Sequence, residues 1–395
     1  MPASQPLEPT DIGLREPGFG IYVHWPFCRA KCPYCDFNVH IREGIDDRSW
    51  LELLMTELDH FHDQTERAIV TSLYFGGGTP SLMAPATVER LIEHVASRWP
   101  VANDIEINLE ANPNDWRRFD GFRGAGVTRL SLGVQSFDDD ALRFLGRDHS
   151  ADTARVALDN ARALFAEVSC DLIYALPGQN ADEWRQALRT NISRLPMHLS
   201  LYQLTVEPGT AFHRARAAGE FESVDGDDAA DFYAVSQEIC EAADMPAYEV
   251  SNHARLGHEC CHNLTYWRGG DYVGVGPGAH GRLTLDGIRT ATRQYRNPET
   301  WGDTVRRRGD GTEARDSLER QSEVEELFIL GLRAVEGISR VRFQERFGTD
   351  VEDACATTEL ADLANAGLIE CDDAGLRVTA TGRPVLNAII GRLIT

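Results

Sequence analysis

The stretch "CRAKCPYCDF", residues 28–37, carries three cysteines separated by three and then two residues, and no fourth cysteine follows nearby. A structural zinc site is closed by four protein ligands, usually from two separated pairs, and no second pair has such a spacing here. A [4Fe–4S] cluster needs a ligand for each iron, so three cysteines leave one iron open to a small chelating molecule. A degenerate zinc site or three buried thiols is the alternative interpretation.

The composition favours a globular protein of the cytoplasm. A chain of 395 residues is long enough for one large domain and a smaller one. The net charge of −23 repels phosphate backbones and the basic residues do not cluster, which argues against nucleic acid as a partner. The first 18 residues lack the features of a secretory signal, and no later stretch is apolar enough to span a membrane. Nine cysteines in such a chain favour a metal or redox use over disulfides.

Short apolar runs alternate with helical patterns from residue 20 to about 250, which is typical of βα units. Six such units predict an α/β fold, a partial (β/α)6 TIM-like barrel, with functional side chains at the carboxyl ends of the strands. We expect Asp47 or Ser49 to be the N-cap of the first helix. The predicted strands are 20–25, 71–77, 104–112, 129–137, 168–176 and 198–206, with 246–252 as a possible seventh, and the predicted helices include 46–61, 86–99 and 181–195.

Four segments are expected along the chain. These are an N-terminal tail (1–19), the barrel (20–250), a glycine-rich region with a linker (251–320) and a C-terminal module (321–395). The Arg-rich stretch "TVRRRGDGTEARDSLER" at the end of the third segment is predicted to be a surface linker.

The C-terminal module is predicted to be a winged-helix-like α+β domain, because its patterns indicate three helices, a short hairpin and a closing helix. Winged helices often bind DNA, but residues 319–395 hold eight arginines against fourteen acidic residues, a net charge of −6. This charge favours a packing or lid role over DNA binding.

The spacing CxxxCxxC, with the aromatic Tyr34 before the last cysteine, resembles the radical S-adenosylmethionine (SAM) superfamily. The resemblance implies a [4Fe–4S] cluster held by Cys28, Cys32 and Cys35, an open iron that binds SAM, and cleavage of the SAM carbon–sulfur bond by the reduced cluster. The run "YFGGGTP", residues 74–80, fits this interpretation because glycines let the backbone approach a ligand. By the resemblance, the SAM-binding residues are Tyr22, Gly76, Gly77, Gly78, Thr79, Glu110, Gln135, Arg147 and Asp171.

Within the superfamily, the chain is most similar to the branch that contains the oxygen-independent coproporphyrinogen III oxidases and related haem chaperones. In the oxidases a further cysteine follows the third by two residues, where this chain has Phe37, and a longer segment precedes the cysteines. Both differences count against oxidative decarboxylation of coproporphyrinogen III to protoporphyrinogen, which stays the alternative function.

The stretch "HNLTYW", residues 262–267, matches the HNxxYW motif associated with haem in the chaperones. A neutral imidazole is a standard axial ligand of haem iron, and aromatic side chains offer apolar surface to a flat macrocycle. We therefore expect His262 to bind the iron, with Tyr266 and Trp267 against the macrocycle and Asn263 orienting the imidazole or a propionate.

The sequence thus favours a haem chaperone that binds haem and a SAM-coordinated [4Fe–4S] cluster and transfers haem from a donor to apo-acceptor proteins. Respiratory enzymes are a candidate class of acceptor by family analogy, and membrane contact is expected to be transient at most. Cys261 and His280 are weaker candidates for the iron ligand, because the motif does not include them. A plain electron carrier or a zinc-stabilised interaction protein is the third possibility. The oligomeric state is not predicted.

Overall fold

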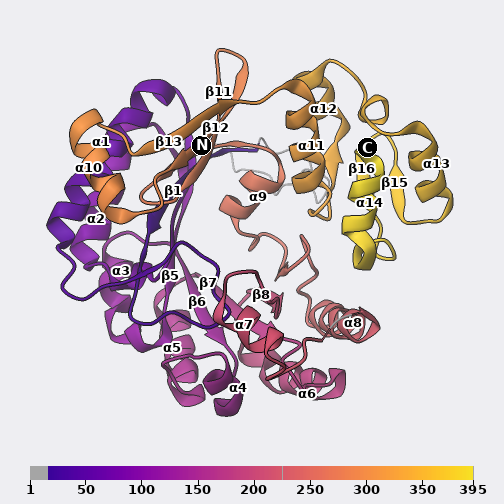
Figure 1. Ribbon diagram of the computed structural model, residues 1–395, viewed down its shortest axis with the longest axis horizontal. Helices are drawn as coiled ribbons and strands as arrows, with labels where there is room; N and C mark the ends of the chain where they lie inside the picture. The colour runs from indigo at the N-terminus through magenta and orange to yellow at the C-terminus, as the bar shows by residue number, and fades with distance from the viewer. Residues whose placement is uncertain (1–16, 225, 395) are drawn as a thin grey trace, which may run out of the picture.

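Six parallel strands form the curved centre of the computed structural model, which describes residues 17–224 and 226–394 (Figure 1). The predicted α/β partial barrel of six βα units is confirmed. The six strands are β1 (Phe19–Trp25), β4 (Val70–Gly77), β5 (Val101–Ala111), β6 (Arg129–Gln135), β7 (Glu167–Tyr174) and β8 (His198–Gln203).

The sheet continues beyond these strands on both edges, to eleven strands in the order β13-β12-β11-β10-β1-β4-β5-β6-β7-β8-β9. The strand β10 pairs parallel to β1, whereas β11, β12 and β13 follow as antiparallel neighbours and β9 pairs antiparallel to β8. The added strands are β9 (Asn252–Ala254), β10 (Asp271–Val275), β11 (His280–Leu285), β12 (Ile288–Gln294) and β13 (Thr312–Ser317).

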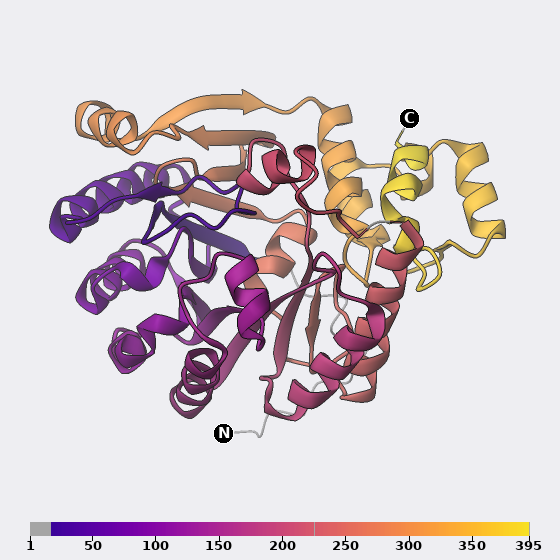
Figure 2. The same ribbon diagram turned by 60° about the horizontal axis from the view of Figure 1, so that its bottom comes forward.

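Helices cover the outer face of the curved sheet, and the apolar core lies between these two layers (Figure 2). Alternate strand residues such as Ile21, Val23 and Leu73 point outward and pack against helix residues such as Leu54 and Leu91. The helices of the barrel are α1 (Asp47–Thr65), α2 (Pro85–Arg98), α3 (Phe119–Gly124), α4 (Asp139–Phe144), α5 (Ala151–Leu164), α6 (Ala181–Asn191), α7 (Ala211–Ala217) and α8 (Gly226–Ala242). Short pieces are β2 (Phe27–Cys28), β3 (His40–Ile41) and the 3₁₀ turns η2 (Pro80–Leu82), η3 (Pro113–Arg118) and η4 (Ile192–Arg194).

Since successive strand residues face opposite ways, the residues between the core positions face the lumen of the barrel. The strand register aligns Gly20, Ser72 and Glu106 in one row and Tyr22, Tyr74 and Asn108 in the next. This alternation gives the lumen a polar and aromatic lining, unlike the apolar outer face.

Three local predictions were wrong. The N-cap of α1 is Asp46, whose carboxylate accepts a hydrogen bond from the Ser49 amide at 3.4 Å, while Asp47 is the first helical residue. Residues 246–251 form no seventh strand of the barrel, since only isolated bridges occur there, and Asn252 begins the short antiparallel β9. The stretch 304–320 is not a loose linker, because it forms the end of α10 (Pro298–Arg308), the edge strand β13 and the beginning of α11.

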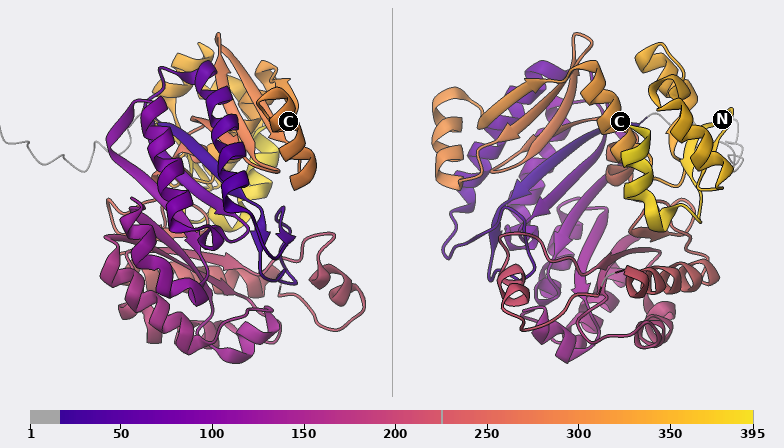
Figure 3. Two further views of the ribbon diagram at one scale, coloured as in Figure 1. Left: turned by 90° about the vertical axis from the view of Figure 1, so that its left-hand side faces the viewer. Right: turned by 45° about the vertical axis from the view of Figure 1, so that its right-hand side comes forward.

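The C-terminal module has its own apolar core and packs beside the open edge of the barrel (Figure 3). The predicted order of three helices, a hairpin and a closing helix is confirmed, and the hairpin forms a three-stranded sheet with β14. Its elements are α11 (Arg320–Gly331), β14 (Ile338–Ser339), α12 (Arg340–Phe347), η5 (Val351–Ala354), α13 (Thr357–Asn365), β15 (Ile369–Cys371), β16 (Gly375–Val378), η6 (Arg383–Val385) and α14 (Leu386–Leu393).

The short helix α9 (Cys261–Trp267) lies between the barrel and the C-terminal module, as Figure 1 shows. It contacts β1, β4 and β10 on one side and α11 on the other. Within the described ranges, no helix is both long and apolar enough to cross a membrane. The division into segments at residues 250 and 320 stays a prediction, although the sheet itself runs through β13.

Candidate functional site

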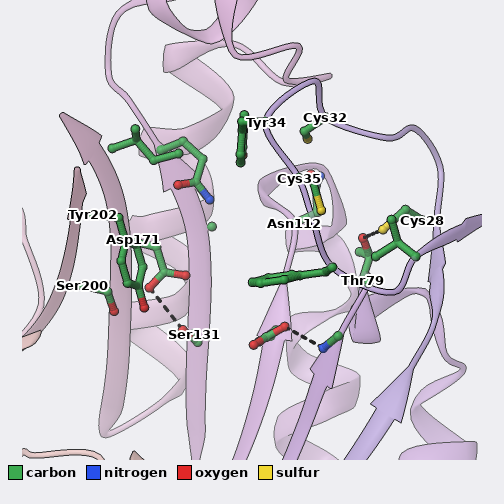
Figure 4. A pocket seen from close by; sticks show the side chains of 18 of the residues that line it. Cys28, Cys32, Tyr34, Cys35, Thr79, Asn112, Ser131, Asp171, Ser200 and Tyr202 are labelled. Carbon is green, nitrogen blue, oxygen red and sulfur yellow. Dashed lines mark hydrogen bonds between the residues drawn. The ribbon is translucent and has the colours of Figure 1, made fainter. Parts of the chain in front are cut away.

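A cavity of about 640 Å³ opens at the carboxyl ends of the parallel strands. The loop with the three cysteines (28–35) forms one side of it, with Thr79 beside the first cysteine, and Asp171, Ser200 and Tyr202 lie across from it (Figure 4). This is the edge of a parallel α/β sheet where ligands usually bind. The expected position of the functional site is therefore matched by a cavity.

Two of the three cysteine sulfurs accept hydrogen bonds from the surrounding protein. The hydroxyl of Thr79 donates to Cys28 Sγ at 3.3 Å, and Arg147 Nη1 donates to Cys32 Sγ at 3.4 Å. The carbonyl of Pro33 accepts a hydrogen bond from the Phe212 amide at the beginning of α7. The loop is thus fixed by neighbouring elements, and a hydroxyl and a guanidinium are placed to stabilise thiolates.

The donor set suits an iron–sulfur cluster. No three histidine, cysteine or carboxylate side chains of the described residues lie close enough together to hold one metal ion. In a cluster each thiolate binds a different iron, so the three sulfurs need not meet at one point. Cys28, Cys32 and Cys35 all line the cavity, which leaves room for a fourth, non-protein ligand on that side.

The glycine loop at the end of β4 has no room for side chains. A Cβ atom on Gly77, whose φ is +111°, would lie 2.6 Å from the His24 ring, and one on Gly78 would lie 2.6 Å from the Phe27 carbonyl oxygen. The Gly78 amide donates to the Trp25 carbonyl at 2.7 Å, which holds the loop against the end of β1. The loop therefore presents bare backbone to the cavity beside the first cysteine.

Two carboxylates lie in the cavity wall, on β5 and β7. Glu110 accepts hydrogen bonds from the Tyr74 hydroxyl at 2.9 Å and from the Gly77 amide at 3.1 Å. Burial, with a smaller contribution from the negative charge of Asp171, raises the pKa of Glu110 to about 7, and burial raises the pKa of Asp171 to about 6. Asp171 accepts a hydrogen bond from Ser131 at 3.5 Å (Figure 4). Both groups thus titrate near neutral pH while facing the cavity.

Most of the residues predicted to bind SAM line this one cavity. They are Gly77, Gly78, Thr79, Glu110, Gln135, Arg147 and Asp171. Tyr22 and Gly76 do not line it and lie behind its wall instead. His24 Nε2 donates to the Asn38 carbonyl, and because burial lowers the pKa of His24 to about 4, its Nδ1 accepts a hydrogen bond from the Tyr22 hydroxyl at 2.9 Å. In this structure the Tyr22 hydroxyl is therefore directed to His24, and a contact of Tyr22 with SAM stays a prediction.

His262, the predicted haem ligand, lies inside the lumen below the cavity, with 1% of its surface exposed. Its Nδ1 is 2.8 Å from the Ser72 hydroxyl and its Nε2 is 2.7 Å from the Tyr266 hydroxyl, so both ring nitrogens are hydrogen-bonded. Burial lowers the pKa of His262 to about 3, so the imidazole is neutral. In this conformation neither nitrogen is available to a metal.

The other side chains of the motif extend from different sides of α9. Asn263 lines the floor of the cavity and donates to the Tyr248 hydroxyl at 3.3 Å. Tyr266 packs edge-on against His262 and Tyr272, and Trp267 is half-buried on the side of the C-terminal module. The motif therefore does not form one exposed face.

The two weaker candidates for the iron ligand lie at the surface. Cys261 is exposed at the beginning of α9, whereas the neighbouring Cys260 is buried, and His280 is exposed at the beginning of β11. Neither side chain reaches the cavity.

Several residues of the cavity wall were not predicted from the sequence. The amide oxygen of Asn108 and Nδ1 of His198 are buried without a hydrogen-bond partner among the described residues, so the cavity floor can accept a polar ligand. The two-residue alternation of side chains along a strand could have identified these residues. Each of them lies two or four residues from another residue of the cavity wall, on the same strand or directly after it, and so faces the same side of the sheet. The missed residues are Tyr74, Asn108, Ser131, His198, Ser200 and Tyr202.

The cavity, the three-cysteine loop and the partial barrel define a class of protein. The Radical SAM superfamily matches residues 22–190, and the HemN C-terminal domain matches residues 318–385. The chain belongs to the radical SAM superfamily, whose cofactors are SAM and a [4Fe–4S] cluster.

Within that superfamily the chain is similar over almost its whole length to particular proteins. It is 36% identical to the heme chaperone HemW of Escherichia coli, with 95% of this chain and 98% of that protein covered. It is 38% identical to the mitochondrial radical S-adenosyl methionine domain-containing protein 1 of Mus musculus, with 99% and 90% covered.

A solved structure has the same fold. The coproporphyrinogen III oxidase HemN of Escherichia coli superposes with a TM-score of 0.79 over 96% of this chain and 91% of that chain, at 22% sequence identity. At this identity the similarity concerns the fold alone.

Proposed function

We propose that this protein is a haem chaperone, which binds haem and a SAM-coordinated [4Fe–4S] cluster and transfers haem to acceptor proteins. The observation that carries the proposal is the full-length similarity to HemW proteins, at 36% identity for the Escherichia coli protein. We propose haem donors and apo-haem proteins as partners and the cytoplasm as the location, with any membrane contact transient.

The cavity residues fit the two cofactors of the superfamily. We propose that Cys28, Cys32 and Cys35 hold the cluster, and that the glycine loop, Glu110, Gln135, Arg147 and Asp171 hold SAM. When bound, the reduced cluster supplies an electron that can cleave the SAM carbon–sulfur bond. The chain itself would position SAM by backbone contact at Gly77 and Gly78, accept ribose hydrogen bonds at Glu110, and exclude water through the cysteine loop.

For haem, we propose His262 as the iron ligand in a second conformation. Both of its nitrogens are engaged here, so ligation requires that the hydrogen bond to Ser72 or the one to Tyr266 be broken. Breaking one such bond leaves a buried hydroxyl unpaired, which costs about 1–3 kcal/mol, and the imidazole, which is 1% exposed, must also move to where haem can reach it. The haem site of this proposal is therefore latent in the conformation described.

The second candidate function is coproporphyrinogen III oxidation, because the fold is the same as that of the oxidase HemN. Against it stands Phe37, which has 62% of its surface exposed at the rim of the cavity, where the oxidases carry a further cysteine. A phenyl ring offers no ligand to iron.

A haem titration of anaerobically reconstituted protein tests the proposal. Wild type should saturate near one haem per chain in the Soret band, and His262→Ala should bind more weakly. His60→Ala, at a histidine of α1 outside the motif and the cavity, is the control. If no specific haem binding occurs and incubation with coproporphyrinogen III, SAM and a reductant yields protoporphyrinogen, the oxidase replaces the chaperone.

A further inference from the structure

The interior of the barrel connects the haem motif physically to the SAM pocket. Five residues are stacked along the lumen, and we call them the lumen column: Gly76, Tyr22, Tyr74, His262 and Tyr266. Figure 1 shows α9, which carries the last two, within the curve of the sheet, between the strands and α11.

The upper half of the lumen column supports the SAM pocket. A Cβ atom on Gly76 would lie 2.8 Å from the Tyr22 ring, 2.9 Å from the Tyr74 ring and 3.1 Å from a carboxylate oxygen of Glu110. The two tyrosine rings stack at 6.0 Å, and Tyr74 donates to Glu110. The first glycine of the SAM loop and the proposed ribose contact thus rest on the same pair of rings.

The lower half of the lumen column rests on His262. Its imidazole stacks on Tyr74 with ring centroids 4.8 Å apart and on Tyr22 at 6.3 Å. It also lies against Gly20, where a Cβ atom would be 3.2 Å from the imidazole. Ser72 fixes one edge of the ring and Tyr266 the other. The position of His262 therefore determines the position of the rings above it.

We propose that His262 is a positioning residue for the SAM pocket, so that haem binding through His262 and SAM binding oppose each other. This inference rests on the proposed haem ligation by His262. Iron can take a ring nitrogen only if the imidazole leaves a hydrogen bond that keeps it under Tyr74 and Tyr22. Because coupling between two ligands is reciprocal, SAM bound above then also holds His262 in the lumen and weakens haem binding.

One substitution tests whether His262 couples the two binding sites or only supports the fold. Ser72→Ala removes the hydroxyl at His262 Nδ1 but keeps the imidazole. The loss of one hydrogen bond should weaken SAM binding and strengthen haem binding, each by roughly threefold to tenfold. A structural defect would instead weaken both. Ser236→Ala is the matched control, because Ser236 is also buried and its hydroxyl also pairs with an aromatic side chain, Trp184, but outside the lumen.

The second measurement adds haem to wild type and to the variant His262→Phe. The affinity of cluster-reconstituted wild type for SAM is measured by equilibrium dialysis without haem and then at saturating haem. We expect a rise in the SAM dissociation constant of about tenfold with haem. His262→Phe keeps a ring but loses both hydrogen bonds, so it should bind SAM more weakly than wild type, and haem should not change its SAM affinity.

The outcomes distinguish the two proposals. Equal SAM affinity with and without haem, together with an unchanged SAM affinity in Ser72→Ala, overturns the coupling while haem ligation by His262 stands. Tighter SAM binding in the presence of haem overturns the coupling as well. If His262→Ala binds haem as tightly as wild type, the ligation fails, and the coupling that rests on it fails too.

Discussion

At the scale of single residues, Gly76 lies where one methyl group would meet two aromatic rings and a carboxylate. Gly76→Ala should therefore displace Tyr22, Tyr74 or Glu110 and weaken SAM binding at least tenfold, because overpacking a filled site forces its neighbours to move. Isothermal titration with SAM on reconstituted protein measures this. Gly124→Ala is the control, since a Cβ atom there meets nothing within 4 Å, and an equal loss in both variants would contradict the argument.

The proposed contact between Glu110 and SAM predicts a pH dependence of SAM binding. Burial raises its pKa to about 7, so the carboxylate is ionised above that pH and protonated below it. The protonated group is a poorer acceptor for hydroxyl groups while it still faces the Tyr74 hydroxyl and the Gly77 amide. The SAM dissociation constant should rise as the pH falls from 8 to 6, by up to about tenfold per pH unit below the pKa.

The Tyr74→Phe variant also tests whether Glu110 is the group whose titration changes SAM binding. The Tyr74 hydroxyl donates to the ionised Glu110, so its removal should raise the pKa of Glu110 and move the midpoint of SAM binding to higher pH. Glu110→Gln should remove the pH dependence of SAM binding that has its midpoint near 7, and leave only the part due to Asp171, whose pKa is about 6. SAM affinity that does not vary between pH 6 and 8 in wild type would exclude Glu110 as the titrating contact.

The sequence motifs predicted which residues lie at the cavity, but they did not predict the contacts that surround those residues. The cysteine spacing, the glycine run and Glu110 pointed to the cavity that the structure contains. The sequence did not indicate that Ser72 hydrogen-bonds His262, because 190 residues separate them in the chain. The contacts of Tyr22 with His24 and of His262 with Tyr266 are local, at separations of two and four residues, but nothing in the sequence indicated that these side chains lie behind the cavity wall.

At the scale of elements, Glu106 of β5 fixes the beginning of α9. Its carboxylate accepts hydrogen bonds from the amides of Cys261 and His262, from Cys260 Sγ and from Arg129, which is itself buried. Glu106→Ala removes the nearest carboxylate of the buried Arg129, which keeps Glu167 at 3.4 Å, and it leaves several buried donors unpaired. The free energy of unfolding should fall by about 2–4 kcal/mol.

Urea denaturation monitored by circular dichroism measures this loss. Asp104→Ala, on the same strand but exposed, should change the free energy of unfolding by less than about 0.5 kcal/mol. Similar values for the two variants would mean that α9 does not depend on Glu106.

Helices and strands with a regular pattern of apolar residues were predicted well. Elements that form through contacts with a neighbouring strand or helix were not. The six parallel strands have apolar residues at alternate positions that make the outer core. By contrast, β13 carries Thr312, Glu313 and Arg315 at the sheet edge and exists through its backbone pairing with β12, so its polar sequence resembled a linker. Helix α10 was missed for a related reason: its buried face consists of few residues, among them Trp301 and Val305, beside three consecutive arginines.

At the scale of the whole molecule, α9 also connects the barrel to the C-terminal module. Arg268, at the end of α9, makes two hydrogen bonds of 2.7 Å to the carboxylate of Glu336, and Arg346 donates to the Gly269 carbonyl at 2.9 Å. Arg268 is largely buried, so loss of the Glu336 carboxylate should lower the free energy of unfolding. The module is therefore placed to influence the lumen column through α9.

Glu336→Gln should loosen this contact and increase amide hydrogen exchange in α9, with a loss of about 2–3 kcal/mol in the free energy of unfolding. Hydrogen exchange followed by mass spectrometry resolves the peptide that contains α9. Glu345→Gln, at an exposed position of α12, should leave this exchange unchanged. Unchanged protection of α9 in Glu336→Gln would show that the module and the lumen are independent.

The overall fold class was predictable because six repeated units and a compact C-terminal pattern each carry local signals. The way in which the parts join was not, because β9 to β13 extend the sheet on both edges and α9 enters the lumen between them. The haem motif was recognised as a motif, but its burial inside the barrel follows only from the three-dimensional arrangement.

The most direct test of the account is a haem transfer measurement. Reconstituted protein loaded with one equivalent of haem is mixed anaerobically with an apo-haem protein, and the Soret spectra of the separated proteins are recorded over time. The account predicts that haem passes from the wild-type protein to the acceptor, and faster when SAM is added. Haem that stays on the protein or never binds specifically, together with loss of carbon dioxide from coproporphyrinogen III, would contradict it.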